Sequence, residues 1–348
     1  VYGLLRYGIK VREAEGEMFQ TVRPINWNPD ELDQNDFAVA EEVTVDGKSP
    51  GAHEKRPDLV LYVNGIALGI LELKRSTVSL SQGIRQNLDN QRPEFIEPFF
   101  ATMQLVMAGN DSEGLAYGTI ETPEKYYLKW KETDDSAPEG LNPLDLGIYQ
   151  ICRPERLLEL IHDFTVFDGG IKKLARYNQY FGTKKAQDFA KRREGGIIWH
   201  TQGSGKSLTM VWLAKWIREN IRDSRILVLT DRVELDEQIE GVFHDVNESI
   251  LRMRGGNQLL EVLGSHQHPL ICSLIHKFGS GKKQGEADVD SFVQSYREKL
   301  KEGFDPKGNI YVFIDECHRT QSGKLHKAMK ELLPVSYTHL RAHETPIN

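Results

Sequence analysis

The sequence predicts an α/β protein built from two successive units. Two apolar, β-rich runs, residues 59–63 and 66–73, are separated by Asn64-Gly65, which is the strongest short signal for a β-hairpin. A polar stretch rich in Pro, Gly and Asp follows over residues 129–147. From residue 196 onward, short apolar runs alternate with helical segments, a pattern typical of a parallel sheet with crossover helices.

The composition bounds the class of protein. The 348 residues include 44 basic and 51 acidic side chains, giving a formal net charge of −7, and 39% are hydrophobic. A core can therefore be buried, and disordered and collagen-like classes are excluded. No apolar run approaches the roughly 18 residues of a membrane span, so we expect no membrane partner. Cys152, Cys272 and Cys317 lie far apart, which favours a reducing, cytoplasmic location.

Charged residues bracket the predicted hairpin. Asp58 precedes its first strand, and Glu72-Leu73-Lys74 end its second. Two carboxylates can hold a divalent metal that activates water, and a lysine two residues along a strand projects from the same face. A salt bridge between Glu72 and Lys74 at the strand end is the simpler alternative.

The register of the hairpin separates these two interpretations. With Asn64-Gly65 as the turn, a regular ladder places Asp58 opposite Leu71, so that Asp58 points away from the face of Glu72. Convergence on one metal requires a β-bulge, a longer turn, or the departure of Asp58 from the strand. We predict such a departure.

A phosphate-binding loop is predicted at residues 200–207, HTQGSGKS, which follow an apolar run and open a helix. Backbone N–H groups and a helix N-terminus together form an anion cradle, and glycines let the backbone approach the phosphates. Lys206 can reach the β and γ oxygens, and the Ser207 hydroxyl can ligate Mg²⁺. His200 stands where the GxxxxGK[ST] pattern has Gly. A simple turn before an amphipathic helix is the alternative, but the preceding strand and following helix favour nucleotide binding.

Two further carboxylates, Asp315 and Glu316, end the apolar run 310–314. A buried parallel strand delivers such residues to the crevice beside the phosphate loop. There Asp315 can hold Mg²⁺, and Glu316 can orient or deprotonate the attacking water.

The loop together with Asp315-Glu316-Cys317-His318 resembles motifs I and II of superfamily 2 helicases and translocases, in the DECH form. This resemblance implies a RecA-like P-loop lobe with a parallel sheet. It also puts Gln179 where these motors carry an adenine-reading glutamine; an ordinary amphipathic helix explains Gln179 equally well.

Asp58, Glu72 and Lys74 resemble the PD-(D/E)xK nuclease motif, which implies a mixed sheet in the first unit. Residues 82–90 predict a helix that is similar to the QxxxY helix of the nuclease group that includes recombination nucleases. Gln86 takes the Gln position, where it could position a metal site or a DNA phosphate, and Asn90 stands where that group has Tyr.

The combination strongly resembles the restriction, or motor, subunit of type I restriction enzymes. It implies ATP and Mg²⁺ as cofactors, double-stranded DNA as substrate, and specificity and methyltransferase subunits as partners. It also implies an endonuclease-like domain over 1–130, a connection over 131–165 and a first RecA-like ATPase lobe over 166–335. The implied catalytic residues are Asp58, Glu72, Lys74, Gln86 and Glu316. The implied cofactor-binding residues are Gln179, Thr201, Gln202, Gly203, Ser204, Gly205, Lys206, Ser207 and Asp315. The implied metal ligands are Asp58, Glu72, Ser207 and Asp315.

Both ends of the chain suggest a fragment. It lacks an initiator Met, and SYTHLRAHETP near its end looks like a translated adaptor sequence. We predict a non-native tail over 336–348, with a divergent final strand as the alternative. We also expect the second motor lobe to be missing and the fragment to be inactive as a motor by itself.

Other functions stay open at this point. The first is a superfamily 2 DNA helicase or remodeller whose N-terminal domain only binds. The second is a P-loop kinase or metabolic NTPase, and the third is a fragment that binds nucleotide without turnover.

Overall fold

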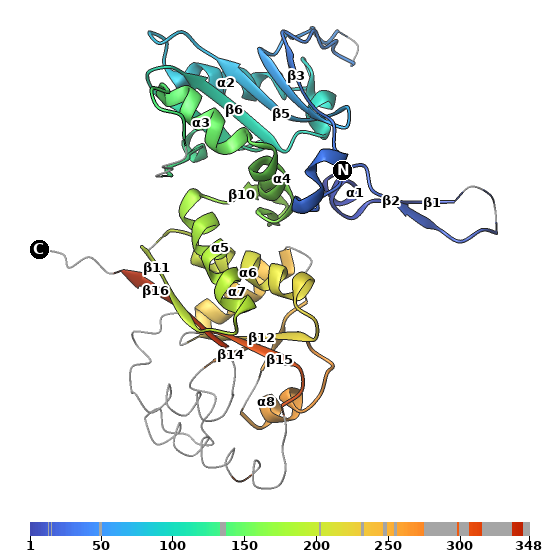
Figure 1. Cartoon of the computed structure of the whole chain (residues 1–348), viewed down its shortest axis with the longest axis vertical. Coiled ribbons are helices and arrows are strands. Elements are labelled where there is room, and N and C mark those ends of the chain that lie inside the picture. The colour runs from blue at the N-terminus through green and yellow to red at the C-terminus, as the bar shows by residue number, and fades with distance from the viewer. Residues whose placement is uncertain are drawn as a thin grey trace, which may run out of the picture. The chain divides into compact units, whose positions relative to one another are not determined.

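The computed structural model describes residues 1–12, 14, 16–48, 51–132, 137–201, 203–230, 233–245, 249–253, 256–274, 298, 306–314 and 336–343. The chain divides into two compact units, Val1–Tyr177 and Asn178–Asn348 (Figure 1). Each unit has its own six-stranded sheet. The α/β class predicted from the sequence is confirmed.

The sheet of the first unit is mixed. Its strands lie in the order β3 (Phe37–Glu41), β4 (Leu59–Val63), β5 (Ile66–Leu73), β6 (Leu105–Asn110), β7 (Gly114–Gly118) and β8 (Leu128–Lys129). β5 and β6 are parallel, and the other neighbours are antiparallel. The predicted hairpin is β4–β5. Its turn residues Asn64 and Gly65 both have positive φ, 51° and 75°, as a type I′ turn requires.

Helices cover both faces of this sheet. α2 (Leu80–Asn90) connects β5 to β6 and packs on one face, where Ile84 lies against Ala108. α3 (Pro143–Cys152) packs on the other face, where Leu144 lies against Gly109. Because Ala108 and Gly109 are neighbours in β6, they point to opposite faces. Every residue of β6 is consequently buried. A charged side chain in this part of the sheet therefore needs hydrogen-bond or ion-pair partners.

The predicted connection over 131–165 is in large part built into the first unit. α3 starts with Asn142 as its N-cap, and Asn142 Oδ1 accepts a hydrogen bond from Asp145 N at 2.9 Å. α4 (Pro154–His162) and the hairpin of β9 (Thr165–Asp168) and β10 (Ile171–Leu174) follow. Asn and Pro are turn residues, but they are equally favoured at a helix N-cap and first turn. The boundary between the units lies after Tyr177, not within 131–165.

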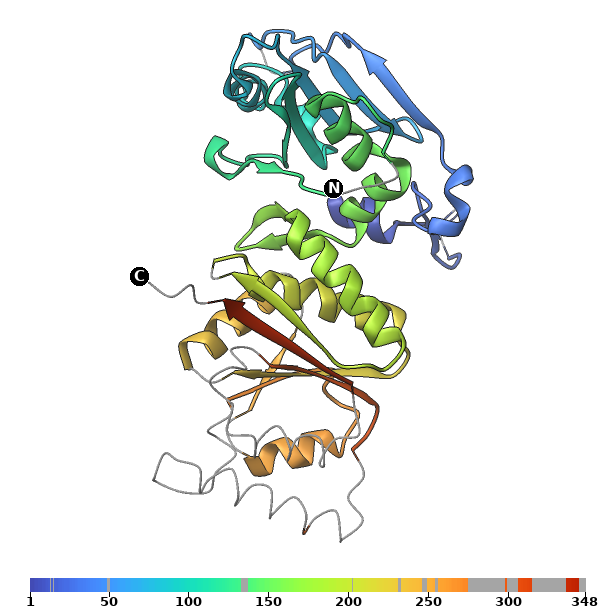
Figure 2. The same cartoon turned by 60° about the vertical axis from the view of Figure 1, so that its left-hand side comes forward.

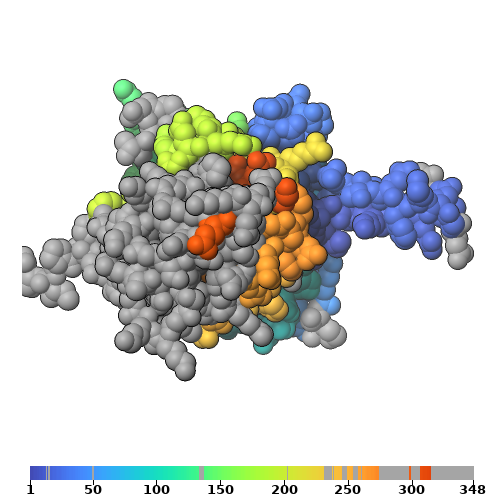
Figure 3. Space-filling model, turned by 90° about the horizontal axis from the view of Figure 1, so that it is seen from below, coloured from blue at the N-terminus to red at the C-terminus, as the bar shows by residue number. Residues whose placement is uncertain are grey.

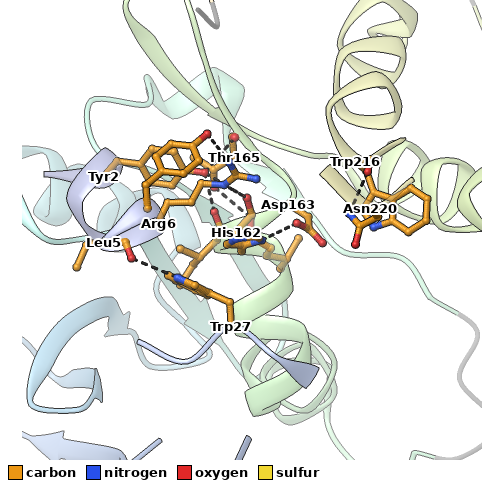
Figure 4. A network of polar contacts seen from close by, with 12 residues as sticks. Tyr2, Leu5, Arg6, Trp27, His162, Asp163, Thr165, Trp216 and Asn220 are labelled. Atoms are coloured by element: carbon orange, nitrogen blue, oxygen red, sulfur yellow. Dashed lines mark hydrogen bonds and ion pairs between the residues drawn. The ribbon is translucent and has the colours of Figure 1, made fainter. Parts of the chain in front are cut away.

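The N-terminal residues are tied to the end of α4 (Figure 4). From α1 (Tyr2–Tyr7), Tyr2 Oη donates to Ile161 O at 3.0 Å and Arg6 Nε donates to His162 O at 2.7 Å. The last carbonyls of a helix lack intrahelical partners, and a cation is favourable there. This capping anchors α1, which is followed by β1 (Ile9–Val11), β2 (Gln20–Val22) and the short helix η1 (Pro29–Gln34). The remaining short helices are η2 (Glu97–Ala101) and η3 (Glu124–Tyr126).

The second unit contains the predicted parallel sheet. Its order is β11 (Gly196–Thr201), β16 (Ser336–His343), β15 (Asn309–Ile314), β12 (Ser224–Thr230), β14 (Leu270–Leu274) and β13 (Leu251–Arg252), and every described neighbour pair is parallel. α5 (Tyr177–Lys191), α6 (Lys206–Asn220) and α7 (Val233–Asp245) cover one side and α8 (Gly256–Leu263) the other (Figure 2). α8 reaches the surface seen from below (Figure 3, orange).

The C-terminal residues differ from the sequence prediction. Residues 336–348 are expected to lie outside the fold, yet Ser336–His343 form β16 between β11 and β15. The segment thus forms a strand, and its origin as a non-native tail stays a prediction. Parallel pairing with β16 satisfies backbone N–H and C=O groups of the edge strand β11. Within the described ranges, no helix is long and apolar enough to span a bilayer.

Candidate functional site

A β-bulge brings the predicted carboxylates to one face. Near the turn, Val63 pairs with Ile66 and Tyr62 with Ala67, but Leu61 pairs with Gly69, which leaves Leu68 as the extra residue. The ladder then continues in the shifted register to Leu59 and Leu71. Continued one step beyond β4, this register brings Asp58 level with Glu72, and the two carboxylates interact. The predicted departure from a regular ladder is confirmed, and its cause is the bulge.

Asp58 and Lys74 both lie beside Glu72. Asp58 Oδ2 accepts a hydrogen bond from Leu73 N at 2.7 Å, which holds the carboxylate over the end of β5. Lys74 Nζ is 3.8 Å from Glu72 Oε2 and donates to Leu73 O at 3.1 Å. The Glu72–Lys74 ion pair, which was the simpler alternative to a metal site, is therefore present. It belongs to a larger cluster that also contains Asp58.

Two amides of α2 hold the Glu72 carboxylate. Gln86 Nε2 donates to Glu72 Oε2 at 2.7 Å, and Asn90 Nδ2 donates to Glu72 Oε1 at 3.3 Å. The two amides are four residues apart, one helical turn, and so lie on one face of α2. Gly83 permits this approach, since a Cβ there would be 3.1 Å from Ala108 Cβ. Sequence reasoning placed Gln86 in the site but gave Asn90 no role; its spacing from Gln86 was the available signal.

The electrostatics of Glu72 are those of a buried acid beside a second acid. Its side chain has no exposed surface. Burial, and then the neighbouring Asp58 carboxylate, raises the pKa of Glu72 to about 7, while the Lys74 ammonium and, more weakly, that of Lys55 oppose the rise. Lys55, which the sequence did not single out, is held with its Nζ 3.8 Å from the centre of the Phe95 ring. A buried carboxyl in such a pair is a typical functional-site feature.

The donor set fits a small hard cation. Mg²⁺ is usually held by one or two carboxylates, with water and substrate oxygens completing its shell. Asp58 and Glu72 supply two carboxylates on one face, with the Lys74 cation beside them. No cluster of three or more His, Cys, Asp or Glu side chains occurs in the described part of the chain, so a cation here would keep several of its own ligands.

The phosphate loop lies between β11 and α6. Gly203 and Gly205 have φ of 74° and 81°, and Gly205 is the N-cap of α6, so backbone N–H groups and the helix N-terminus meet at the loop. Lys206 and Ser207 open the helix. Ser204 is buried, and its Oγ has no hydrogen-bond partner among the described residues. Thr201 ends β11, while Gln202, Asp315 and Glu316 lie outside the described residues.

Gln179 of α5 contacts this loop directly. Its Nε2 donates to Gly205 O at 2.9 Å, and a Cβ on Gly205 would lie 2.4 Å from the same nitrogen. His200, at the position where the loop pattern has Gly, is buried beneath α5 with its Nε2 3.1 Å from Asn178 O. Burial lowers the pKa of His200, and the nearby Lys206 ammonium contributes to the lowering. Through its hydrogen bond to Gly205 O, Gln179 thus contributes to the backbone conformation of the loop.

Two family models match the chain along its length. The model of the type I restriction enzyme R protein N terminus matches residues 1–125, and that of the SWI2/SNF2 ATPase matches residues 178–348. Among solved structures, the Sulfolobus solfataricus SWI2/SNF2 ATPase core in complex with double-stranded DNA is 15% identical, with a TM-score of 0.38, and the match covers 53% of this chain and 34% of that one. That overlap is partial, and the assignment rests on the family models and on sequence relatives.

Sequence relatives carry both segments in one chain. The putative type I restriction enzyme MjaIXP endonuclease subunit of Methanocaldococcus jannaschii is 27% identical over 100% of this chain and 34% of its own. The type I restriction enzyme HindI endonuclease subunit of Haemophilus influenzae is 26% identical over 98% of this chain and 33% of its own. The resemblance inferred from the motifs is confirmed: the chain is similar over its whole length to type I restriction enzyme endonuclease subunits, and it spans about a third of the length of these relatives.

Proposed function

We propose that the first unit is a metal-dependent DNA nuclease and the second the first ATPase lobe of a DNA translocase, together serving a type I restriction enzyme. The observation that carries this proposal is the bulge at Leu68, which sets Asp58 opposite Glu72 with Lys74 beside them. A bulge costs regular ladder hydrogen bonds, and bulges are over-represented next to active sites.

In the nuclease unit, Asp58 and Glu72 would hold Mg²⁺, and Gln86 would fix the orientation of the Glu72 carboxylate. When bound, Mg²⁺ polarises the scissile phosphate and favours deprotonation of the attacking water. Lys74 lies within 3.8 Å of Glu72 Oε2, so its ammonium would offset the negative charge that develops on the phosphate oxygens. Glu72 is buried and Asp58 and Lys74 are half-buried, and the hydrogen bonds that hold Glu72 and Asp58 would keep this arrangement fixed before the DNA arrives.

In the motor unit, the N–H groups of residues 201–207 and the Lys206 ammonium would bind the phosphates of ATP, with Ser207 and Asp315 holding its Mg²⁺. Glu316 would orient the attacking water. Gln179 would read the adenine while its Nε2 contacts the loop at Gly205 O. Such a contact would couple the presence of the base to the geometry of the phosphate site.

We further propose double-stranded DNA as the substrate, with specificity and methyltransferase subunits as partners and the cytoplasm as the place of action. The relatives named as endonuclease subunits of type I restriction enzymes support this assembly. A formal charge of −7 is compatible with it, because a protein that tracks DNA needs basic side chains only along its channel.

A superfamily 2 remodeller with a binding-only first unit is the second candidate, supported by the SWI2/SNF2 match over 178–348. It gives no reason for a second acid and a lysine to converge around a buried glutamate. The convergence of Asp58, Glu72 and Lys74 favours the nuclease.

The test uses the complete enzyme assembled with its partner subunits. Lys206→Ala is expected to abolish ATP hydrolysis, translocation and remote cutting together. Glu72→Ala is expected to abolish cutting while DNA-dependent ATP hydrolysis persists. Normal cleavage by the Glu72→Ala enzyme would refute the nuclease site, and loss of both activities in that variant would point to a folding defect, which a thermal transition would reveal.

A further inference from the structure

Asn90 occupies an unusual position at the C-terminal end of α2. Its side chain is 1% exposed, and its Nδ2 donates to Glu72 Oε1 at 3.3 Å. Within the described part of the chain, its Oδ1 is buried without a hydrogen-bond partner. A buried, unpaired amide oxygen costs stability, so the reason for an amide at this position has to lie in what its Nδ2 donor contacts.

The neighbouring Asn87 shows what a structural amide on this helix does. Asn87 is fully buried, and its Nδ2 donates to Met107 O at 2.8 Å, which ties α2 to β6. Asn90 instead directs its donor at the carboxylate of the candidate site. Among the described residues the Oδ1 of Asn87 is also buried without a partner. The two asparagines therefore differ in the target of the Nδ2 donor, which is a backbone carbonyl for Asn87 and Glu72 for Asn90.

We propose that Asn90 is a positioning residue for the metal site. Gln86 holds Glu72 Oε2 and Asn90 holds Glu72 Oε1, and a planar carboxylate held at both oxygens cannot rotate about its last bond. The lone pairs that remain on the two oxygens then keep fixed directions in the carboxylate plane. The inference rests on the proposed metal-dependent nuclease and adds the residue that fixes its central ligand.

The unpaired Asn90 Oδ1 fits the same role. A hydrated divalent cation brings water molecules with it, and such water needs acceptors in the protein. An amide that donates to the ligand and accepts from that water would serve both the carboxylate and the shell around the cation. Groups that orient a ligand in this way typically change metal affinity by about 10–100-fold when removed.

The experiment is calorimetric titration of the full 348-residue chain with Mn²⁺ at pH 8, alongside thermal unfolding. Asn90→Leu, which keeps the branched shape of Asn but is larger, and Asn90→Ala, which adds no apolar bulk, both remove the amide. Asn87→Leu is the matched control, and Glu72→Gln identifies the heat that belongs to this site. We expect both Asn90 variants to bind Mn²⁺ about 10–100-fold more weakly than wild type, and Asn87→Leu to unfold at lower temperature with wild-type Mn²⁺ affinity.

The outcomes separate this inference from the proposed function. Wild-type Mn²⁺ affinity in a folded Asn90→Ala or Asn90→Leu chain would overturn the positioning role while leaving the nuclease in place. Binding of Mn²⁺ by wild type that Glu72→Gln does not weaken would overturn both, since the site would then not depend on its central carboxylate.

Discussion

Glu72→Gln should stabilise the first unit at neutral and alkaline pH. The substitution keeps the volume of the side chain and removes its charge. Burial and the adjacent Asp58 raise the pKa of Glu72 from its ordinary value of 4.5 to about 7. The folded chain therefore keeps a proton that the unfolded chain has released, and the free energy of unfolding falls as the pH rises from 4.5 through about 7.

The magnitude follows from that gap. One pKa unit corresponds to about 1.4 kcal/mol, so ionised Glu72 destabilises the fold by about 3 kcal/mol above pH 7. The neutral amide avoids this cost, and the unpaired Asn90 Oδ1 can turn to accept its N–H. For a unit of this size, about 3 kcal/mol corresponds to roughly 6–12 °C in transition temperature.

The assay is differential scanning calorimetry of the chain at pH 5 and pH 8. Glu72→Gln should raise the transition of the first unit at pH 8 and change it little at pH 5, where Glu72 is largely protonated. Glu54→Gln, the same chemical change at an exposed position, should leave both transitions unaltered. Equal transitions of wild type and Glu72→Gln at pH 8 would refute the reasoning, because Glu72 would then not be a strained buried acid.

Three further predictions concern the same two sites. Mn²⁺ affinity of the first unit should fall about tenfold for each pH unit below 7, because a protonated Glu72 cannot ligate; a flat titration from pH 5 to 8 would contradict this. Gly83→Ala should displace α2, because its Cβ would lie 3.1 Å from a β6 side chain, and should therefore weaken Mn²⁺ binding. Gly241→Ala is the control at a helical position with open space, and it should be neutral or stabilise the fold by about 0.5–1 kcal/mol. Gly205→Ala should abolish binding of a fluorescent ATP analogue because Gly205 has φ of +81° and a Cβ there would collide with Gln179; retention of wild-type affinity would count against the loop assignment.

Local sequence signals are sufficient to predict the elements that have characteristic turn residues or a clear hydrophobic period. Asn64-Gly65 predicts the turn because few other pairs adopt positive φ at both positions, and the structure has it there. The strand before the phosphate loop and the helix after it follow from an apolar run, two glycines and a helical period, and β11 and α6 lie there.

Other features depend on tertiary context. The need for an irregularity between Asp58 and Glu72 was deducible from the register, but nothing local distinguishes Leu68 as the bulged residue. Asn142 and Pro143 suit a turn or a helix start equally, and the apolar face of α3 decides between them only once a sheet lies beneath it. Asn90 shows the same limit, since its contact with Glu72 depends on the depth to which α2 packs.

The most direct test of the nuclease assignment is an anomalous difference map from crystals of the chain soaked in Mn²⁺. The account predicts a peak about 2.1 Å from carboxylate oxygens of both Asp58 and Glu72, which Glu72→Gln removes. A clean map at this position in crystals whose Asp58 and Glu72 are ordered, with Mn²⁺ bound elsewhere, would contradict a metal-dependent nuclease in the first unit.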